Sequence, residues 1–277
     1  MTVTREIEKF EDLIEIGTTF GQNWFRGHSK VIGELTPLIF RSEYTDSVYI
    51  NLNPNPEFRI AINFKREAPS IIKELPEYSD HLEWLFLMQH HGTPTRLLDW
   101  SENILIAAFF AINSDYNEDA EIWSIFPWHL NNLHGWYGLP LMEDKTLSFL
   151  AHEIFHNNAK ELAEEYGLKD IPRIPMAFSP PLSHPRITAQ QSCFTIHPEP
   201  QVGFSIPEVI KEEKYLVRYI IRKRLKKEIE KKLMYLGITY RTIYPDLDGL
   251  AKSIKQSETF PGWSQPEPLK FKEYKKE

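Results

Sequence analysis

The densest cluster of reactive side chains lies in residues 89–101, whose sequence is QHHGTPTRLLDWS. This block holds two histidines, two threonines, an arginine, an aspartate and a serine between the apolar segments 82–88 and 104–111. Histidine is a ready acid or base near neutral pH, and arginine binds phosphate or carboxylate groups. A solvated loop has no need of Trp100, so we expect the block at the mouth of a pocket.

The polar residues of this block cannot all face one ligand. Adjacent positions of a helix diverge by about 100°, so His90 and His91 point in different directions. One of them is expected to face the pocket, while the other packs or caps. Thr95, Arg96 and Asp99 could form a local network that rigidifies the turn, or Arg96 or Asp99 could contact a ligand directly. Asp99 could also cap the helix that starts near Asn103, although Ser101 is better placed for that.

A second candidate position lies at the end of a short strand predicted over residues 23–27. The Arg26 guanidinium could hold a phosphate or carboxylate there, and Gly27 could let the backbone approach a ligand. Arg26 could instead be structural, paired with Asp99 or with another buried carboxylate.

A third candidate pair, Arg186 and Gln190, precedes a strand predicted over residues 191–197. The Gln190 amide can donate and accept hydrogen bonds at the same time, which suits a ligand hydroxyl pair or amide. The alternative is a glutamine that bonds to the backbone at a strand edge.

Two other motifs have a plain structural interpretation. His152, Glu153 and His156 form a His-Glu-x-x-His pattern, which on one helix would supply two zinc ligands and a base. Leu162 stands where a third histidine ligand would be needed, so we expect no metal, and a zinc metallopeptidase is a minor alternative. The basic run 222–227 could contact phosphates, but we expect it to be the solvated face of a helix.

Composition excludes several classes of protein. The chain has 277 residues with 42% hydrophobic and 13% aromatic residues, enough to bury a sizeable core. Its net charge of -7 gives no general attraction to nucleic acid or membrane. Apolar runs fall far short of the roughly 20 residues that span a bilayer. With Cys193 as its one cysteine, the chain is expected to be cytoplasmic.

Hydrophobic periodicity predicts an α+β fold in a single globular domain, with a mixed or antiparallel sheet and packed helices. We expect this domain over residues 1–257 and a polar C-terminal tail over 258–277. Besides the strands already named, strands are predicted at 121–126 and 216–221, and the proline-rich segment 171–186 is predicted to be a loop. Helices are predicted at 6–21, 57–68, 83–90, 103–113, 145–166 and 226–236, with a final short one from 244.

Four blocks of the chain resemble the FRG domain family, which is named for a Phe-Arg-Gly motif. The blocks are Phe25-Arg26-Gly27, residues 89–100, the group Arg186, Gln190 and Phe194, and residues 244–250. The long central block is the specific one. Ser192 departs from the pattern, which usually has glycine there, and this puts the close backbone approach at that strand in doubt.

A more distant fold-level resemblance, to ADP-ribosyltransferases, would start an NAD site at Arg26 and Gly27, continue it at the 95–101 turn and put Gln190 where the catalytic glutamate stands. Gln190 cannot act as a carboxylate base. The resemblance implies a nucleotide- or NAD-related effector enzyme, either an ADP-ribosyltransferase or an NAD glycohydrolase, in the role of a toxin or phage-defence component.

The residues expected in this site fall into two groups. The candidate catalytic residues are Arg26, His91, Asp99 and Gln190, and the candidate cofactor-binding residues are Gly27, His90, Thr95, Arg96, Ser101 and Arg186. NAD is the expected cofactor, and a protein or nucleic acid is the expected target. The alternative is a non-catalytic module that binds a nucleotide or a nucleic acid in the same pocket. The sequence does not predict the oligomeric state.

Overall fold

A computed structural model describes residues 2–41, 44, 56–114, 116–135, 138, 144–156, 158–181, 184–200 and 202–259. One seven-stranded sheet has the strand order β1-β7-β4-β2-β3-β6-β5. β1 runs parallel to β7, and the other neighbours are antiparallel. The strands are β1 (Val3–Ile7), β2 (Trp24–His28), β3 (Leu97–Ser101), β4 (Ala120–Ile125), β5 (Met176–Phe178), β6 (Ser192–Ile196) and β7 (Leu216–Ile221).

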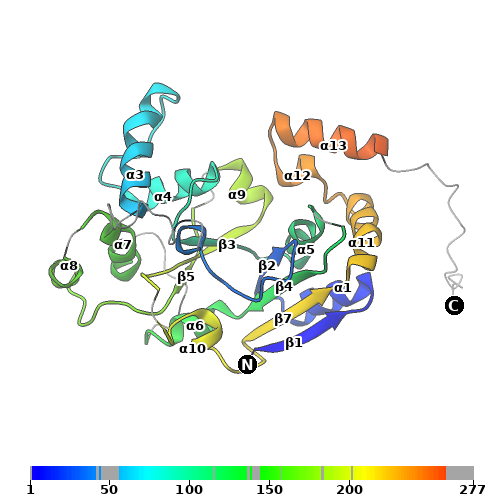
Figure 1. Cartoon of the computed structure of the whole chain (residues 1–277), viewed down its shortest axis with the longest axis horizontal. Coiled ribbons are helices and arrows are strands. Elements are labelled where there is room, and N and C mark those ends of the chain that lie inside the picture. Colours follow the sequence, from blue (N-terminus) through cyan, green and yellow to red (C-terminus); the bar gives the residue numbers. More distant parts are fainter. Residues whose placement is uncertain are drawn as a thin grey trace, which may run out of the picture.

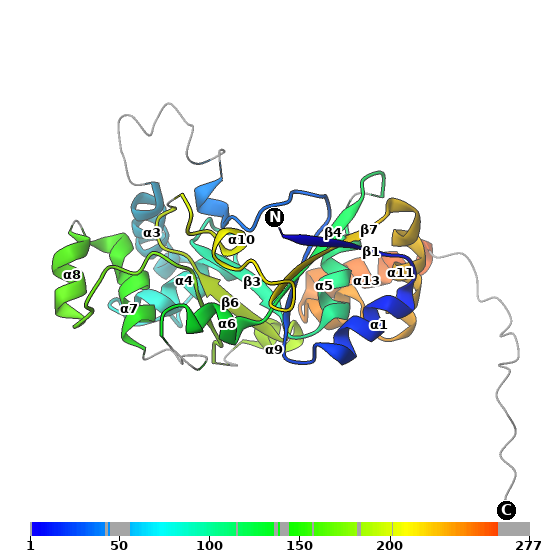
Figure 2. The same cartoon turned by 90° about the horizontal axis from the view of Figure 1, so that it is seen from below.

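Helices pack on this sheet in two groups (Figures 1 and 2). One group, α1 (Phe10–Thr19), α5 (Ile104–Ile112), α11 (Lys223–Tyr235) and α12 (Tyr240–Ile243), shares a core with β1, β4 and β7. The other group, α3 (Pro56–Glu67), α4 (His81–His90), α7 (Lys145–His152) and α8 (Ala159–Glu165), packs near β5 and β6. The remaining helices are α6 (Pro127–Asn132), α9 (Pro185–Ala189), α10 (Ile206–Val209) and α13 (Leu247–Thr259). The predicted α+β class and mixed sheet are thus confirmed.

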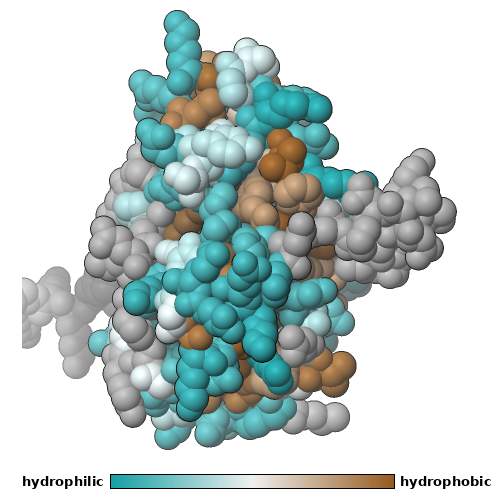
Figure 3. Space-filling view, turned by 90° about the vertical axis from the view of Figure 1, so that its left-hand side faces the viewer, coloured by the Kyte–Doolittle hydropathy of each residue, from teal (hydrophilic) through white to brown (hydrophobic). Residues whose placement is uncertain are grey.

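The apolar sides of the second group explain why these helices form. α7 buries Leu147, Phe149 and Leu150, while Asp144 caps its first turn by accepting from two backbone N–H groups. Seen from the side of α7 and α8, the surface is largely hydrophilic with scattered apolar patches (Figure 3). None of the helices in the described ranges is long and apolar enough to cross a bilayer.

Most of the predicted elements are present, and the differences have local causes. The helix predicted at 6–21 is preceded by β1, an edge strand whose middle residues are exposed and so show no alternation. The segment 145–166 is broken after His152, because a 3₁₀ turn and the N-cap Asn158 separate α7 from α8. The proline-rich segment contains β5, a three-residue edge strand that follows Pro175.

The two ends of the predicted C-terminal region also differ from expectation. The final helix is longer than predicted and runs to Thr259. The predicted tail lies, from residue 260 onward, outside the described residues. The basic run begins α11, and its face is not wholly solvated, because Lys226 is buried and donates from Nζ to the Ser29 carbonyl at 2.8 Å.

Candidate functional site

A cavity of about 460 Å³ lies where β2 and β3 separate. These two strands pair at a single position, Phe25 opposite Ser101, and beyond it the register stops. Side chains from both strands, from the end of α4, from α9 and from Tyr244 then line the gap. Its polar lining consists of Arg26, His28, Ser29, Arg41, Gln89, His90, Asp99, Ser101, His184, Arg186, Gln190, Ser192 and Tyr244.

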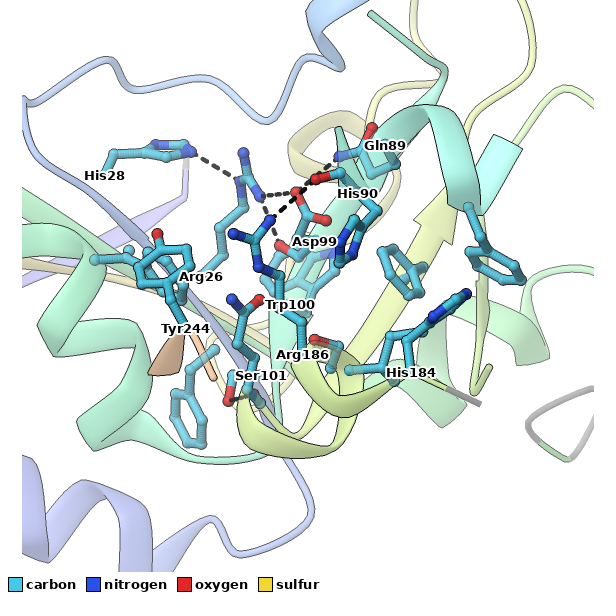
Figure 4. A pocket seen from close by; sticks show the side chains of 18 of the residues that line it. Arg26, His28, Gln89, His90, Asp99, Trp100, Ser101, His184, Arg186 and Tyr244 are labelled. Carbon is cyan, nitrogen blue, oxygen red and sulfur yellow. Dashed lines mark hydrogen bonds and ion pairs between the residues drawn. The ribbon is translucent and has the colours of Figure 1, made fainter. Parts of the chain in front are cut away.

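Arg26 is held at two of its edges (Figure 4). Its Nε donates to His28 Nε2 at 2.9 Å, and its Nη1 donates to the Asp99 carbonyl oxygen at 2.6 Å. The Asp99 carboxylate lies 3.6 Å from the same Nη1. Burial lowers the pKa of Arg26, and the charge of Asp99 opposes that shift. The predicted structural pairing of Arg26 with Asp99 is therefore present, inside the cavity itself.

A hydrogen-bonded chain orients the Asp99 carboxylate, whose side chain is 49% exposed. Thr95 Oγ1 donates to Gln89 Oε1, so the other end of that amide must present its N–H groups. Gln89 Nε2 donates to Asp99 Oδ2 at 2.8 Å. Asp99 thus offers a fixed carboxylate to the cavity, and the network around it includes the predicted Thr95 but contains Gln89 in place of the predicted Arg96.

Arg186 and Tyr244 form another part of the cavity wall (Figure 4). Its Nη1 donates to the His90 carbonyl at 3.0 Å, its Nη2 lies 3.4 Å from Asp246 Oδ2, and its guanidinium lies 4.7 Å from the Tyr244 ring centroid. Its buried Nε has no hydrogen-bond partner among the described residues. Burial and the charge of Arg186 lower the pKa of His90 to about 4, so the His90 ring is neutral at pH 7.

Gln190, at the end of α9, connects the segment before Tyr244 to strand β3. Its Nε2 donates to the Ile243 carbonyl at 3.2 Å, and its backbone carbonyl accepts from Ser101 Oγ at 2.8 Å. Gln191, between α9 and β6, has a φ of 45°, whereas Ser192 begins β6 in regular pairing. A residue in the left-handed region therefore directly precedes β6, and Ser192 itself takes a regular strand position.

The structure shows a packing role for Gly27, whereas the sequence suggested that it lets the backbone approach a ligand. A Cβ at this position would lie 1.9 Å from the Ala107 carbonyl oxygen and 2.8 Å from the Ala111 nitrogen. The glycine lets α5 lie directly on β2. Although Gly27 borders the cavity, the backbone that it admits belongs to a helix of the same chain.

Three of the predicted site residues do not line the cavity. Arg96 is 4% exposed and turns away from it, into a buried ion-pair network. Its Nη2 lies 2.8 Å from Glu57 Oε2, and its Nη1 lies 2.8 Å from Glu153 Oε2. His91 caps α4 on the exposed surface, which leaves His90 as the histidine of the pair that faces the cavity. Thr95 is fully buried behind Gln89.

The His-Glu-x-x-His motif does not lie on one helix, because α7 ends at His152 and His156 is extended. Glu153 is engaged with Arg96, and His152 Nδ1 lies 3.2 Å from the Tyr166 hydroxyl. No group of three or more potential metal-binding side chains occurs in the described parts of the chain. The zinc hypothesis needs both histidines on one helix, and the structure does not place them so.

His197 is buried directly after β6, and we expect it to make stability depend on pH. Burial lowers the pKa of His197 to about 3, with the charges of Arg26 and Arg96 acting in the same direction. Histidine has a pKa of about 6.5 in the unfolded chain, so below that pH the unfolded chain binds a proton at this residue and the folded chain does not. His197 alone should therefore lower the free energy of unfolding by up to about 1.4 kcal/mol for each pH unit between pH 6 and 4, in addition to any contribution from His90.

Urea unfolding at several pH values measures this slope, and His197→Gln is the control because it removes the titrating group. The variant should show a shallower decrease over the same range. An identical slope in both proteins would assign the acid sensitivity to other groups.

Several cavity residues were not singled out from the sequence. Gln89 belongs to the central block, and its role could have been inferred from its place one helical turn before the Gly92 stop. Tyr244 belongs to a quoted block, but nothing in its spacing indicates that it meets Arg186. His28 continues the alternation of β2 beyond Arg26, which was a usable signal. Arg41 and His184 carry no sequence signal of their own.

Comparison with known protein families finds that residues 21–120 match the FRG domain. No curated protein and no solved structure matches the chain. The matched range contains four residues that line the cavity, Arg26 and Asp99 from the sheet and Gln89 and His90 from the end of α4. The resemblance seen in the sequence motifs is confirmed over this range, so the segment 21–120 is similar to the FRG domain.

Proposed function

We propose that the cavity binds a nucleotide of the NAD class and that the protein cleaves the bond between nicotinamide and ribose. The observation that carries this proposal is the meeting of Arg26 with Asp99 in one cavity. There a guanidinium with an unengaged nitrogen lies 3.6 Å from a half-exposed, oriented carboxylate. Such a pair suits a ligand that carries both phosphates and a sugar on which positive charge develops.

The remaining lining supports the same class of ligand. Arg186 supplies a second cation, and aromatic side chains such as Phe86, Trp100 and Tyr244 offer flat surfaces to a base. The neutral His90 ring adds a polar group without adding charge. Together they form a concave site with a few convergent polar groups, which is typical of cofactor pockets.

In the proposed step, the bond between ribose C1′ and the nicotinamide nitrogen breaks, and its electron pair leaves with neutral nicotinamide. The ribosyl group becomes an oxocarbenium ion, which the Asp99 carboxylate stabilises. Water, or a nucleophile of a protein or nucleic-acid target, then bonds to C1′ and releases a proton. Gln190 has its Nε2 engaged by Ile243, so its Oε1 remains to orient a ribose hydroxyl.

This activity would fit an effector that consumes NAD or modifies a target, as a toxin or a phage-defence component does. Asp99 takes the carboxylate part that Gln190 cannot play. The choice between a glycohydrolase and a transferase depends on which nucleophile reaches C1′.

Incubation with NAD and chromatographic detection of free nicotinamide test the proposal. Asp99→Asn keeps the side-chain shape but removes its charge, and we expect release to fall at least about 100-fold. Arg26→Ala should weaken ADP-ribose binding by about 30-fold, because it removes a charge-assisted contact. Arg222→Ala, a surface arginine outside the cavity, is the matched control and should leave both unchanged.

The outcomes separate the two classes of function. Nucleotide binding without nicotinamide release would support the non-catalytic binding module. Neither binding nor release by the wild-type protein would contradict the proposal in both forms.

A further inference from the structure

A buried acid–histidine pair lies directly behind Arg26. His28 is 8% exposed and Glu121 is fully buried, and His28 Nδ1 lies 2.9 Å from Glu121 Oε1. The two residues are register partners on β2 and β4. Glu121 also accepts from the Gly33 backbone and from Trp123 Nε1, both at 3.1 Å. These donors hold the carboxylate in its charged form and lower the pKa of Glu121.

The contacts of His28 determine where its proton lies. Arg26 Nε can only donate, so His28 Nε2, 2.9 Å away, must be the unprotonated acceptor. The proton then lies on Nδ1 and is donated to Glu121. Burial lowers the pKa of His28, which favours this neutral form. A protonated ring would place N–H against N–H at the Arg26 contact.

We propose that His28 and Glu121 are positioning residues, which fix the Arg26 guanidinium toward the anionic group of the ligand. This inference rests on the proposed function in one respect, because it takes Arg26 as the ligand anchor. His28 holds Nε, and the Asp99 carbonyl holds Nη1, so the planar group is fixed at two edges. Nη2 bonds to none of the described residues, and Figure 4 shows Arg26 between its two partners.

Fixing the guanidinium before the ligand arrives strengthens binding. A free arginine side chain must give up rotamer freedom on binding, and this entropic cost weakens the affinity. Here folding meets that cost, because Glu121 fixes the tautomer of His28 and His28 fixes Arg26. Glu121 contacts His28, and His28 contacts Arg26, so the binding side chain is oriented by partners that do not touch the bound molecule. Carboxylates orient histidines at metal sites in the same way.

A purely structural role for this pair must be distinguished from positioning. Glu121 also accepts from the Ile32 and Gly33 backbone and so holds the segment that follows β2. Changing Glu121 would therefore disturb the fold as well as Arg26. His28 is the better residue to vary, because its contact with Arg26 is made by Nε2, the ring nitrogen that does not face Glu121.

Two isosteric replacements of His28 divide its functions. In His28→Gln the amide reaches the place of Nε2 and can still accept from Arg26. In His28→Asn the shorter amide reaches only the place of Nδ1 and faces Glu121. We expect ADP-ribose affinity to fall about tenfold in His28→Asn and to stay within about twofold of wild type in His28→Gln. Equal losses in both variants would overturn the proposal.

A double-mutant cycle supplies the second test. In the Arg26→Ala background, His28→Asn should leave ADP-ribose affinity unchanged, because its effect passes through Arg26. A tenfold loss in both backgrounds would show a general structural effect and would contradict positioning.

The Arg26 Nε–H proton resonance gives a readout that needs no ligand. It should be protected from solvent exchange in wild type and in His28→Gln, and it should exchange rapidly in His28→Asn. Rapid exchange in wild type would refute the contact. If wild type failed to bind ADP-ribose, the proposed function would fail, while this resonance would still decide whether His28 positions Arg26.

Discussion

Arg96→Ala should destabilise the protein by about 3–5 kcal/mol, enough to remove much of the stability of a typical domain. The buried guanidinium contacts Glu57 and Glu153, and it also donates to the Leu150 carbonyl at 3.0 Å. Its loss leaves a carboxylate on α3 and another on the turn after α7 without their cation. The penalty arises mainly from those uncompensated buried charges.

Urea unfolding followed by circular dichroism measures this loss, with Arg222→Ala as the matched control. Arg222 also contacts two carboxylates, Glu6 and Asp119, but its side chain is 48% exposed. Water can solvate the partners left behind, so the control should lose far less stability than Arg96→Ala. A similar loss in both variants would mean that burial does not set the strength of the Arg96 network.

Gly27→Ala should cost at least about 3 kcal/mol, although it adds a single methyl group. The added Cβ would lie 1.9 Å from a backbone oxygen of α5, and no side-chain rotation can relieve a contact between two backbones. Either α5 must shift from β2 or the strand must bend. Both changes would disturb the core that includes Phe25 and Ala107.

Thermal unfolding of Gly27→Ala beside Gly21→Ala tests this steric reason. A Cβ at Gly21 would meet nothing closer than 3.9 Å, so its substitution should change stability by less than about 0.5 kcal/mol. If Gly27→Ala unfolded at the wild-type temperature, the direct contact of α5 with β2 would be refuted.

The sequence predicted the elements whose burial pattern is strong. The apolar run at 103–113 could have been a helix or a strand by periodicity, and its nine-residue helix α5 is capped by Asn103. Edge elements escaped prediction, because β1 and β5 each have only one sheet neighbour and so carry little alternation. Their existence depends on pairing with distant strands, which local patterns do not encode.

For the site, residue type was a better guide than residue role. The sequence selected Arg26, Asp99 and Gln190, and the structure brings all three to one cavity. It also selected Arg96, which bonds instead to Glu57 and Glu153. A buried arginine and a ligand-binding arginine have the same chemistry, so only the positions of distant carboxylates can distinguish them.

The pairing of the strands has a practical consequence for the size of the folding unit. The family match ends at residue 120, where β4 begins, yet β2 takes β4 as its neighbour and β3 takes β6. A fragment cut at the match would leave the outer edges of β2 and β3 unpaired and would lose the α9 wall of the cavity. Such edges promote aggregation. The unit that folds is therefore wider than the segment by which the family is recognised, and expression of residues 21–120 alone should yield insoluble protein.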